Sequence, residues 1–350
     1  MAKIGIVRDE RYLLHDMGYH PESPDRLRTI YQMLGEKQME GRFAEIPPRA
    51  ATKAEIETVH APSYVDRVAE TAGKPHVSLD PDTSTCPASY EAAVWAVGGL
   101  FEAIDAVIDG EMDGAFALLR PPGHHAEKAR AMGFCLFNNV AIGARHAQKR
   151  YGFDRILVVD WDLHHGNGTQ HSFYDESEVL YFSTHQYPFY PGTGAANEIG
   201  QKAGEGYTVN VPLSAGCGNS EYANIFVHIL RPIALAYQPQ LILVSAGFDI
   251  HFRDPLGSMR VTDIGFARLM NVLKDIARST CSGKIVVTLE GGYDLTALNE
   301  SVKAVLLEMK DDDNWVDQEK CQSQENADYK NIERGIETLR RILGKYWQDL

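Results

Sequence analysis

Apolar runs that stop abruptly at an acid or a glycine recur along this chain of 350 residues. The clearest is 156–159, four aliphatic residues that end at Asp160. Such a run is typical of a strand buried on both faces of a parallel sheet. The other runs lie near 3–8, 115–119, 179–183, 207–211, 240–246 and 284–289, and helical patterns fall between most of them. The alternation predicts an α/β fold with a mostly parallel sheet covered by helices on both faces.

The chain is long enough, at 44% hydrophobic residues, to bury one large core, and it shows no internal repeat or low-complexity linker. We therefore expect one domain over residues 1–350, with the motif-bearing core at about 20–310. The polar stretch 311–330 is expected to cross the surface. Apolar positions at helical spacing then predict a closing amphipathic helix at about 330–348 that packs on the core.

The net charge of the chain indicates which kinds of ligand it can bind. A net charge of −14, from 34 basic and 48 acidic residues without a Lys/Arg cluster, disfavours nucleic-acid binding and would suit a cationic substrate. The five cysteines are scattered and form no Cys-x-x-Cys pair, which is typical of free thiols in a reducing compartment. We find no signal peptide and no run long enough to cross a membrane, so we expect a cytoplasmic protein without a membrane partner.

Polar residues follow the strand that ends at Asp160. Side chains two residues apart point the same way on an extended chain, so Asp160, Asp162 and His164 face together. A second buried strand delivers Asp249 to the same sheet edge, where open α/β sheets keep their sites. Asp162, His164 and Asp249 would form an open three-ligand set for catalytic zinc, and they would also accept Fe(II), Co(II) or Mn(II). The alternative is a capped strand end whose acids hold loop amides.

A pair of histidines, His124 and His125, lies in a loop made rigid by two prolines and a glycine. A buried His pair is often only a hydrogen-bonded core feature, but beside a metal it suits proton transfer. Asp160 can orient one imidazole and Asn167 the other. A carboxylate favours imidazolium, whereas an amide leaves the base closer to its usual pKa of about 6.5. One histidine can then stay charged while its neighbour moves protons.

The last apolar run ends in Glu290-Gly291-Gly292-Tyr293. The two glycines allow close approach of the backbone at this strand end. Tyr293 would then place its phenol where a carbonyl oxygen binds, as an oxyanion donor. The alternative is a core tyrosine with a satisfied hydroxyl.

Six motifs occur in order along the chain. They are Arg-Pro-Pro-Gly-His-His (120–125), Gly-Phe-Cys-Leu-Phe-Asn-Asn (133–139), Asp-Trp-Asp-Leu-His-His-Gly-Asn-Gly-Thr-Gln (160–170), Gly-Phe-Asp (247–249), Asp-Pro-Leu-Gly (254–257) and Glu-Gly-Gly-Tyr (290–293). With them the chain resembles the zinc-dependent histone deacetylases from about residue 20 to 295, nearest to class II and the bacterial deacetylase-like amidohydrolases. The resemblance implies an arginase/deacetylase-like three-layer sandwich around an eight-stranded, mostly parallel sheet.

The resemblance also implies roles in the catalytic centre, with zinc on the three-ligand set described above. His125, near Asn167, would be the general base and later the general acid. His124, paired with Asp160, would act electrostatically. Tyr293 would polarise the acyl carbonyl together with the metal. The implied reaction is hydrolysis of an acyl amide by a metal-activated water.

A narrow acyl-lysine tunnel is implied as well. Gly133 would offer its backbone carbonyl near the substrate amide, and Phe134 and Tyr190 would flank the acyl chain. Most relatives have Phe at the second wall, so Tyr190 adds a hydroxyl to the tunnel. Arg26 would line an internal cavity for acetate release.

Potassium ions are a further implied ligand, bound near the sheet edge. The first site would use Asp160, Asp162, His164, Ser183 and Thr184. The second would use Phe173, Glu176, Val179 and Tyr207.

The expected reaction is deacetylation of ε-N-acetyl-lysine in peptides or proteins, and the nearest alternative substrate is a small acylated amine such as an acetylpolyamine. Polyamine-selective relatives carry an acid at the tunnel mouth, whereas this chain has Leu256, which cannot offset the desolvation of a second cation. Asp82 leaves both readings open, because a rim acid could hold a peptide amide or attract a polyamine. A ureohydrolase would need more bridging carboxylates, and a non-catalytic acyl-lysine binding protein would be expected to lack a ligand, the His pair or Tyr293. Acyl-chain length and self-association stay open.

Overall fold

Eight strands form one sheet at the centre of the computed structural model, which describes residues 2–311, 316–348 and 350. The strands are β1 (Ile4–Val7), β2 (Ala44–Glu45), β5 (Gly114–Ala117), β6 (Ile156–Asp160), β7 (Val179–Gln186), β8 (Thr208–Leu213), β9 (Leu241–Ala246) and β10 (Ile285–Leu289). Paired neighbours run parallel, in the order β2-β1-β5-β10-β9-β6-β7-β8. The expected α/β fold around an eight-stranded sheet is confirmed. The short edge strand β2 is not among the predicted strands.

The middle of the sheet decides where the polar loops emerge. Strands β6, β9 and β10 are mostly aliphatic and are buried along their whole length, as the apolar runs predict. Their register aligns Asp160 with Ser245, and Ala246 with Leu289. Since the three strands are parallel and end level with one another, the residues that follow them meet at one edge of the sheet.

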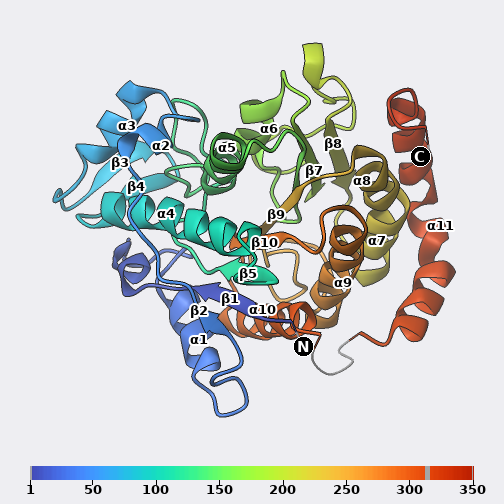
Figure 1. Cartoon of the computed structure of the whole chain (residues 1–350), viewed down its shortest axis with the longest axis horizontal. Helices are drawn as coiled ribbons and strands as arrows, with labels where there is room; N and C mark the ends of the chain where they lie inside the picture. Colours follow the sequence, from blue (N-terminus) through green and yellow to red (C-terminus); the bar gives the residue numbers. More distant parts are fainter. Residues whose placement is uncertain (1, 312–315, 349) are drawn as a thin grey trace.

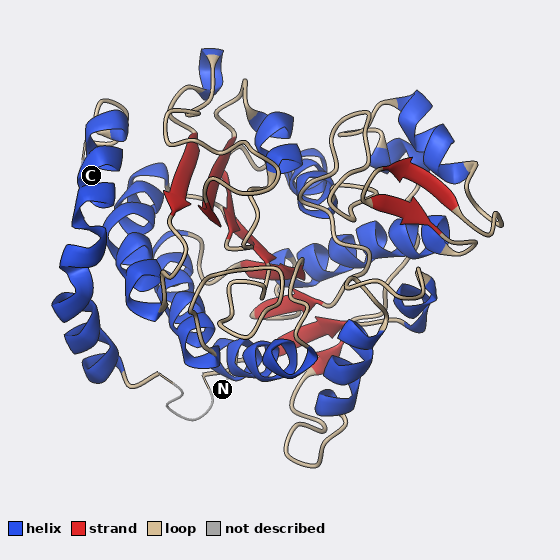
Figure 2. Cartoon of the chain, turned by 180° about the vertical axis from the view of Figure 1, so that it is seen from behind, coloured by secondary structure: helices blue, strands red, loops and turns tan. Residues whose placement is uncertain are grey.

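Helices cover both faces, which makes three layers (Figures 1 and 2). In Figure 1, α4 (Ser89–Ile108) and α5 (Asn139–Tyr151) lie on one side of the central strands, and α9 (Asp263–Thr280) and α10 (Leu295–Met309) lie on the other. The second layer continues through α7 (Asn219–Ile225), a π-helical turn (Phe226–Leu230) and α8 (Arg231–Tyr237), and α1 (Asp25–Leu34) packs beside α10. No helix within the described residues is both long and apolar enough to span a bilayer.

Several short elements lie between the main strands and helices, four of them within residues 53–85. They are 3₁₀ turns at Glu10–Leu14 and Lys202–Gly204, α2 (Lys53–Ile56), α3 (Pro62–Ala69), an antiparallel pair of β3 (Val77–Asp80) and β4 (Thr83–Thr85), and α6 (Asn167–Phe173). Helix α6 follows the polar motif after β6, and the β3–β4 pair carries the loop with Asp82.

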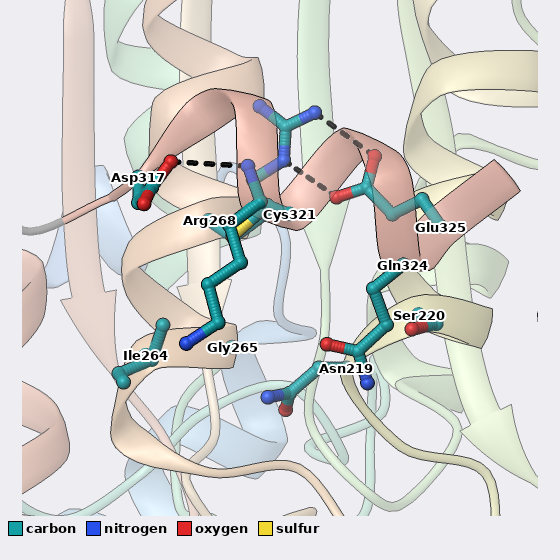
Figure 3. Close-up of a pocket in the computed structure, with 10 residues that line it drawn as sticks. Asn219, Ser220, Ile264, Gly265, Arg268, Asp317, Cys321, Gln324 and Glu325 are labelled. Carbon is teal, nitrogen blue, oxygen red and sulfur yellow. Dashed lines mark hydrogen bonds and ion pairs between the residues drawn. The ribbon is translucent and has the colours of Figure 1, made fainter. Parts of the chain in front are cut away.

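The closing helix differs from its prediction. Helix α11 runs from Gln318 to Leu343, so the predicted start near 330 and end near 348 are wrong. The Asp317 carboxylate caps the helix by accepting from Lys320 N at 3.0 Å, and the Gln, Glu, Lys and Ala residues that follow favour helix. The first half is held by charge. Arg268 of α9 donates two hydrogen bonds, of 2.8 and 3.0 Å, to the Glu325 carboxylate beside a surface pocket (Figure 3).

Candidate active site

Three metal-ligating side chains converge beyond the ends of β6 and β9. One ligand atom from each of Asp162, His164 and Asp249 can be chosen so that all lie within 4.8 Å of one another. His164 Nδ1 lies 3.2 Å from Asp162 Oδ1 and 3.1 Å from Asp249 Oδ2. Both carboxylates are fully buried. The predicted convergence of these three residues is confirmed.

Main-chain amides hold the two carboxylates in place. Asp162 accepts from His164 N at 2.9 Å and from Gly291 N at 2.8 Å, and Asp249 accepts from Leu163 N at 2.9 Å. A Cβ atom at Gly291 would lie 2.4 Å from Asp249 Oδ2 and 2.6 Å from Asp162 Oδ2. The first glycine after Glu290 therefore lets the β10 loop approach the carboxylates.

The electrostatics of this cluster favour a cation. Burial lowers the pKa of His164, but its hydrogen bonds to Asp162 and Asp249 outweigh burial and raise it to about 9. Burial and the nearby Asp162 charge raise the pKa of Asp249 to about 7. Two buried carboxylates this close favour a positive charge between them, and a divalent ion could replace the proton on His164. The O, N, O donors fit zinc.

The two adjacent histidines take the partners that the sequence predicts. His124 Nδ1 lies 3.1 Å from Asp160 Oδ2, and His125 Nδ1 lies 2.8 Å from Asn167 Oδ1. All four residues are buried. The Tyr181 hydroxyl donates to the same Asp160 oxygen at 3.0 Å and helps to fix that carboxylate.

These partners separate the two imidazoles in pKa. Burial lowers the pKa of His124, but the charges of Asp162 and Asp160 outweigh burial and raise it to about 10. Burial and then the charges on His124 and His164 hold the pKa of His125 well below its usual range. The expectation that the amide partner leaves His125 near 6.5 is therefore wrong, because the neighbouring cations and burial dominate. His125 is neutral and can accept a proton.

Tyr293 lies at the same edge. The Asp254 carboxylate accepts from Tyr293 N at 2.6 Å, the Phe134 ring meets the Tyr293 ring edge to face at 6.1 Å, and the Arg26 guanidinium lies 5.1 Å from its centroid. Burial raises the pKa of Tyr293 well above its usual range, so the phenol keeps its proton. A neutral phenol can donate a hydrogen bond, as an oxyanion donor must.

Comparison with known proteins agrees with this arrangement. Residues 20–309 match the family model described as the histone deacetylase domain. The chain belongs to the histone deacetylase family. The resemblance seen in the six motifs is confirmed, and relatives of the chain are named as deacetylases.

Its relatives in the family come from plants, archaea and animals. Histone deacetylase 15 of Arabidopsis thaliana is 44% identical over 308 residues, which are 85% of this chain and 55% of that protein. A probable deacetylase of Archaeoglobus fulgidus is 38% identical over 356 residues, 98% of each chain. Human polyamine deacetylase HDAC10 is 41% identical over 304 residues, 83% of this chain and 45% of that protein. The chain thus spans about half the length of the plant and human relatives.

The crystal structure of the HDA15 HD domain has the same fold. It matches with a TM-score of 0.89 at 39% identity and covers 99% of this chain and 96% of that one. The predicted arginase/deacetylase-like sandwich is confirmed.

The residues predicted to line a tunnel gather around His125. Gly133 and Phe134 have φ of 57° and 68°, and a Cβ at Gly133 would lie 2.2 Å from His125 Cδ2. The Tyr190 ring meets the His125 ring edge to face at 5.1 Å. Phe189, which the sequence reasoning missed, stacks on His164 at 5.7 Å. A glycine is needed at 133 because the chain turns left-handed against the imidazole.

The remaining substrate residues predicted from the sequence lie around this group. Asp82 accepts from Gly133 N at 2.9 Å. Leu256 N donates to the Asp254 carboxylate at 3.0 Å, so Asp254 supports both the Leu256 loop and the Tyr293 loop. Arg26 is fully buried and donates to Gly292 O at 2.6 Å.

The residues assigned to potassium lie along β7 and its neighbours. Ser183 is aligned with Asp160 in the sheet, and Thr184 Oγ1 is buried without a hydrogen-bond partner among the described residues. For the second set, Glu176 N donates to Phe173 O at 3.3 Å, Val179 begins β7, and Tyr207 O accepts from Tyr181 N at 2.9 Å. The Glu176 carboxylate is paired with Arg145 at 2.5 Å, so its side chain already has a cation.

Two supporting acids were not predicted. Glu290 accepts from Gly123 N at 2.7 Å and His124 N at 3.2 Å, and its other oxygen accepts from Ser245 at 3.0 Å. Asp254 accepts hydrogen bonds from the main chain of Tyr293 and of Leu256. Both acids lie inside the recognised motifs, but they bind backbone amides, and spacing alone does not reveal such partners.

Proposed function

We propose that this deacetylase uses zinc to hydrolyse acetyl groups from ε-N-acetyl-lysine in peptides or proteins. The observation that carries the proposal is the convergence of Asp162, His164 and Asp249 beside a neutral His125. Their donor set would hold the ion. When bound, zinc supplies Lewis-acid activation of water and of the acyl carbonyl.

The protein's own groups then move the protons. His125 takes a proton from the attacking water as the water oxygen bonds to the acyl carbon. Tyr293 donates a hydrogen bond to the oxygen on which negative charge develops. His125 returns its proton to the leaving nitrogen as the carbon–nitrogen bond breaks, which gives a carboxylate and a free amine. His124 stays charged, because Asp162 and Asp160 hold its proton. Its positive charge stabilises the negative charge that develops on the acyl oxygen.

The tunnel mouth favours a lysine side chain over a polyamine. Asp80 forms an ion pair with Arg130 at 2.7 Å, and Asp82 accepts from Gly133 N at 2.9 Å and from the Thr83 hydroxyl at 2.7 Å. Both rim acids therefore already have partners within the chain. An acetylpolyamine is the second candidate, because the 41% identical human relative is named a polyamine deacetylase.

A comparison of substrates tests this choice. We expect a higher kcat/KM on an acetyl-lysine peptide than on acetylspermidine or acetylputrescine for the native enzyme. Leu256→Glu should raise kcat/KM on the polyamines, and Leu256→Gln, which has a similar size without the charge, should not. Native preference for the polyamine, or no gain from the glutamate, would overturn the assignment to lysine.

Metal content tests the zinc assignment. We expect one zinc per chain in the active protein, loss of turnover on chelation, and recovery with zinc. Recovery with Fe(II) or Co(II) but not with zinc would contradict the choice of metal.

Potassium is proposed as a structural ion at the two sets along β7. Ser183 and Thr184 support the first set, because they lie beside Asp160 and one of their hydroxyls is buried and unpaired among the described residues. We expect a higher melting temperature in potassium chloride than in sodium chloride at equal ionic strength, and equal values would remove the proposal.

A further inference from the structure

The amide that orients the proposed general base is itself held by a carboxylate. Asn167 Oδ1 lies 2.8 Å from His125 Nδ1, and on its other side Asn167 Nδ2 donates to Glu127 Oε1 at 2.5 Å. A second contact joins Nδ2 to the main-chain oxygen of His125 at 3.3 Å. Asn167 is buried, so these groups, rather than solvent, decide which way its amide points.

The carboxylate fixes the direction of the amide. A carboxylate only accepts hydrogen bonds, so the NH₂ group of Asn167 must face Glu127. The reversed amide would place its oxygen against a carboxylate oxygen and its NH₂ group against the imidazole. The main-chain oxygen of His125 favours the same direction, because it too is only an acceptor. The amide oxygen is thereby left to face His125 Nδ1.

The direction of the amide decides where His125 carries its proton. An amide oxygen accepts, so Nδ1 of His125 must be the protonated nitrogen. A neutral imidazole carries a single proton, and this hydrogen bond holds that proton on Nδ1. Nε2 then has a free lone pair. A reversed Asn167 would instead favour the proton on Nε2, and the ring could not take a proton there.

We propose that Glu127 is a positioning residue that selects, through Asn167, the tautomer of His125 in which Nε2 is free to act as the base. The inference rests on the proposed role of His125 as general base, and it adds a residue that touches neither the reacting atoms nor the metal ligands.

The surroundings of Glu127 supply a control. Its side chain also accepts from His171 Nδ1 at 2.8 Å, on α6, where the hydrogen bond to Glu127 raises the pKa of His171. His171 is about half exposed and lies outside the catalytic centre. The main chain of Glu127 bonds separately to Arg130 and His60, so a side-chain substitution leaves those bonds in place.

The experiment compares Glu127→Leu, Glu127→Gln and the control His171→Gln in the full chain loaded with zinc. We expect Glu127→Leu to lower kcat about 10- to 100-fold, the range found for hydrogen-bond partners of metal-ligating side chains, with KM within about twofold of native. Glu127→Gln keeps a carbonyl that can accept from Asn167, so it should retain more activity. His171→Gln should stay within about twofold of native.

A spectroscopic readout separates this role from a general loss of structure. In ¹⁵N-labelled native protein, we expect His125 to show a protonated Nδ1 and an unprotonated Nε2. Glu127→Leu, and to a smaller extent Glu127→Gln, should show a population with the proton on Nε2. Glu127→Gln carries the test if Glu127→Leu does not fold, with native zinc content as the criterion of an intact site.

Two results would overturn the inference. One is native kcat in both Glu127 variants. The other is a loss of activity with the His125 tautomer unchanged and zinc fully bound, which would make Glu127 merely structural. The tautomer measurement does not depend on turnover, so it tests the role of Glu127 alone. The role of His125 as the base is tested separately, since normal turnover of His125→Ala would contradict it.

Discussion

His124 and His125 lie with their ring centroids 4.0 Å apart, yet their Nδ1 atoms face a carboxylate and an amide, respectively. Neighbouring imidazoles in such close contact cannot easily both be charged. Because Asp160 and Asp162 hold the proton on His124, its charge helps to keep His125 neutral. The pair thus divides into a charged imidazole and a neutral one.

Removal of His125, the proposed base, is the most direct test of this division. We expect His125→Ala to lower kcat on an acetyl-lysine peptide by at least about a hundredfold. Zinc should remain bound, because His125 is outside the three-ligand set. Turnover and metal content are measured on the same preparation. Near-native turnover would remove His125 from both proton transfers.

Tyr293→Phe tests the oxyanion donor. The change removes one hydroxyl. We expect kcat to fall about 10²- to 10³-fold, which corresponds to an activation barrier higher by about 2.7 to 4 kcal/mol, as for other oxyanion donors. KM should change little, because the contact strengthens only as charge develops. Steady-state kinetics separate the two constants. A large rise in KM with kcat preserved would make Tyr293 a binding residue instead.

Gly291→Ala tests how closely the β10 loop approaches the metal ligands. The new Cβ would lie 2.4 Å from Asp249 Oδ2, so the carboxylates must move, and we expect zinc affinity to fall at least about tenfold. Competition with a chelator measures that affinity. Gly335→Ala is the control, since this glycine lies on the exposed side of α11, where a new Cβ would meet Ile332 Cδ1 at an ordinary contact distance of 3.5 Å. Equal zinc affinity in both variants would contradict the steric argument.

A buried histidine away from the site predicts how stability depends on pH. His60 lies between Glu127 O and Asn138 N, and burial lowers its pKa from 6.5 to about 4. Between these values the unfolded chain binds a proton that the folded chain does not. The contribution of His60 is therefore fully present above pH 6.5 and is lost as pH falls toward 4, up to about 3 kcal/mol.

Urea unfolding at pH 7 and pH 5 measures this effect. We expect the native protein to lose more free energy of unfolding between the two pH values than His60→Gln does. Part of the dependence should persist in the variant, because burial also lowers the pKa of His185 to about 4. Identical pH dependence in the native protein and the variant would contradict the assignment to His60.

The parts of this protein that could be predicted are those that local patterns determine. Continuous aliphatic runs identified the central strands, and a two-residue repeat after β6 placed Asp160, Asp162 and His164 on one side. Level strand ends then brought Asp249 beside them. Such features need only the period of the backbone and the rule that parallel strands end at one edge.

The parts that could not be predicted depend on contacts between distant segments. The first half of helix α11 is held on α9 by the pairing of Glu325 with Arg268, which no apolar stripe signals. Glu290 supports the His124 loop across the fold, through main-chain amides rather than side chains. The pKa of His125 falls first because the ring is buried and then because His124 and His164 are packed around it, which the identity of its amide partner alone does not reveal.

The Asp254 carboxylate accepts hydrogen bonds from the main chain of both Leu256 and Tyr293. One carboxylate therefore positions both Leu256, which is expected to choose the substrate, and Tyr293, which is expected to act on its acyl group. A change at Asp254 is therefore expected to alter substrate preference and turnover together. If substitutions in the 254–257 loop removed Asp254 during evolution, they would also displace Tyr293. Substitutions at position 256 leave the main-chain contact to Asp254 in place, so they are the route by which a new substrate preference can evolve at the lowest cost to turnover.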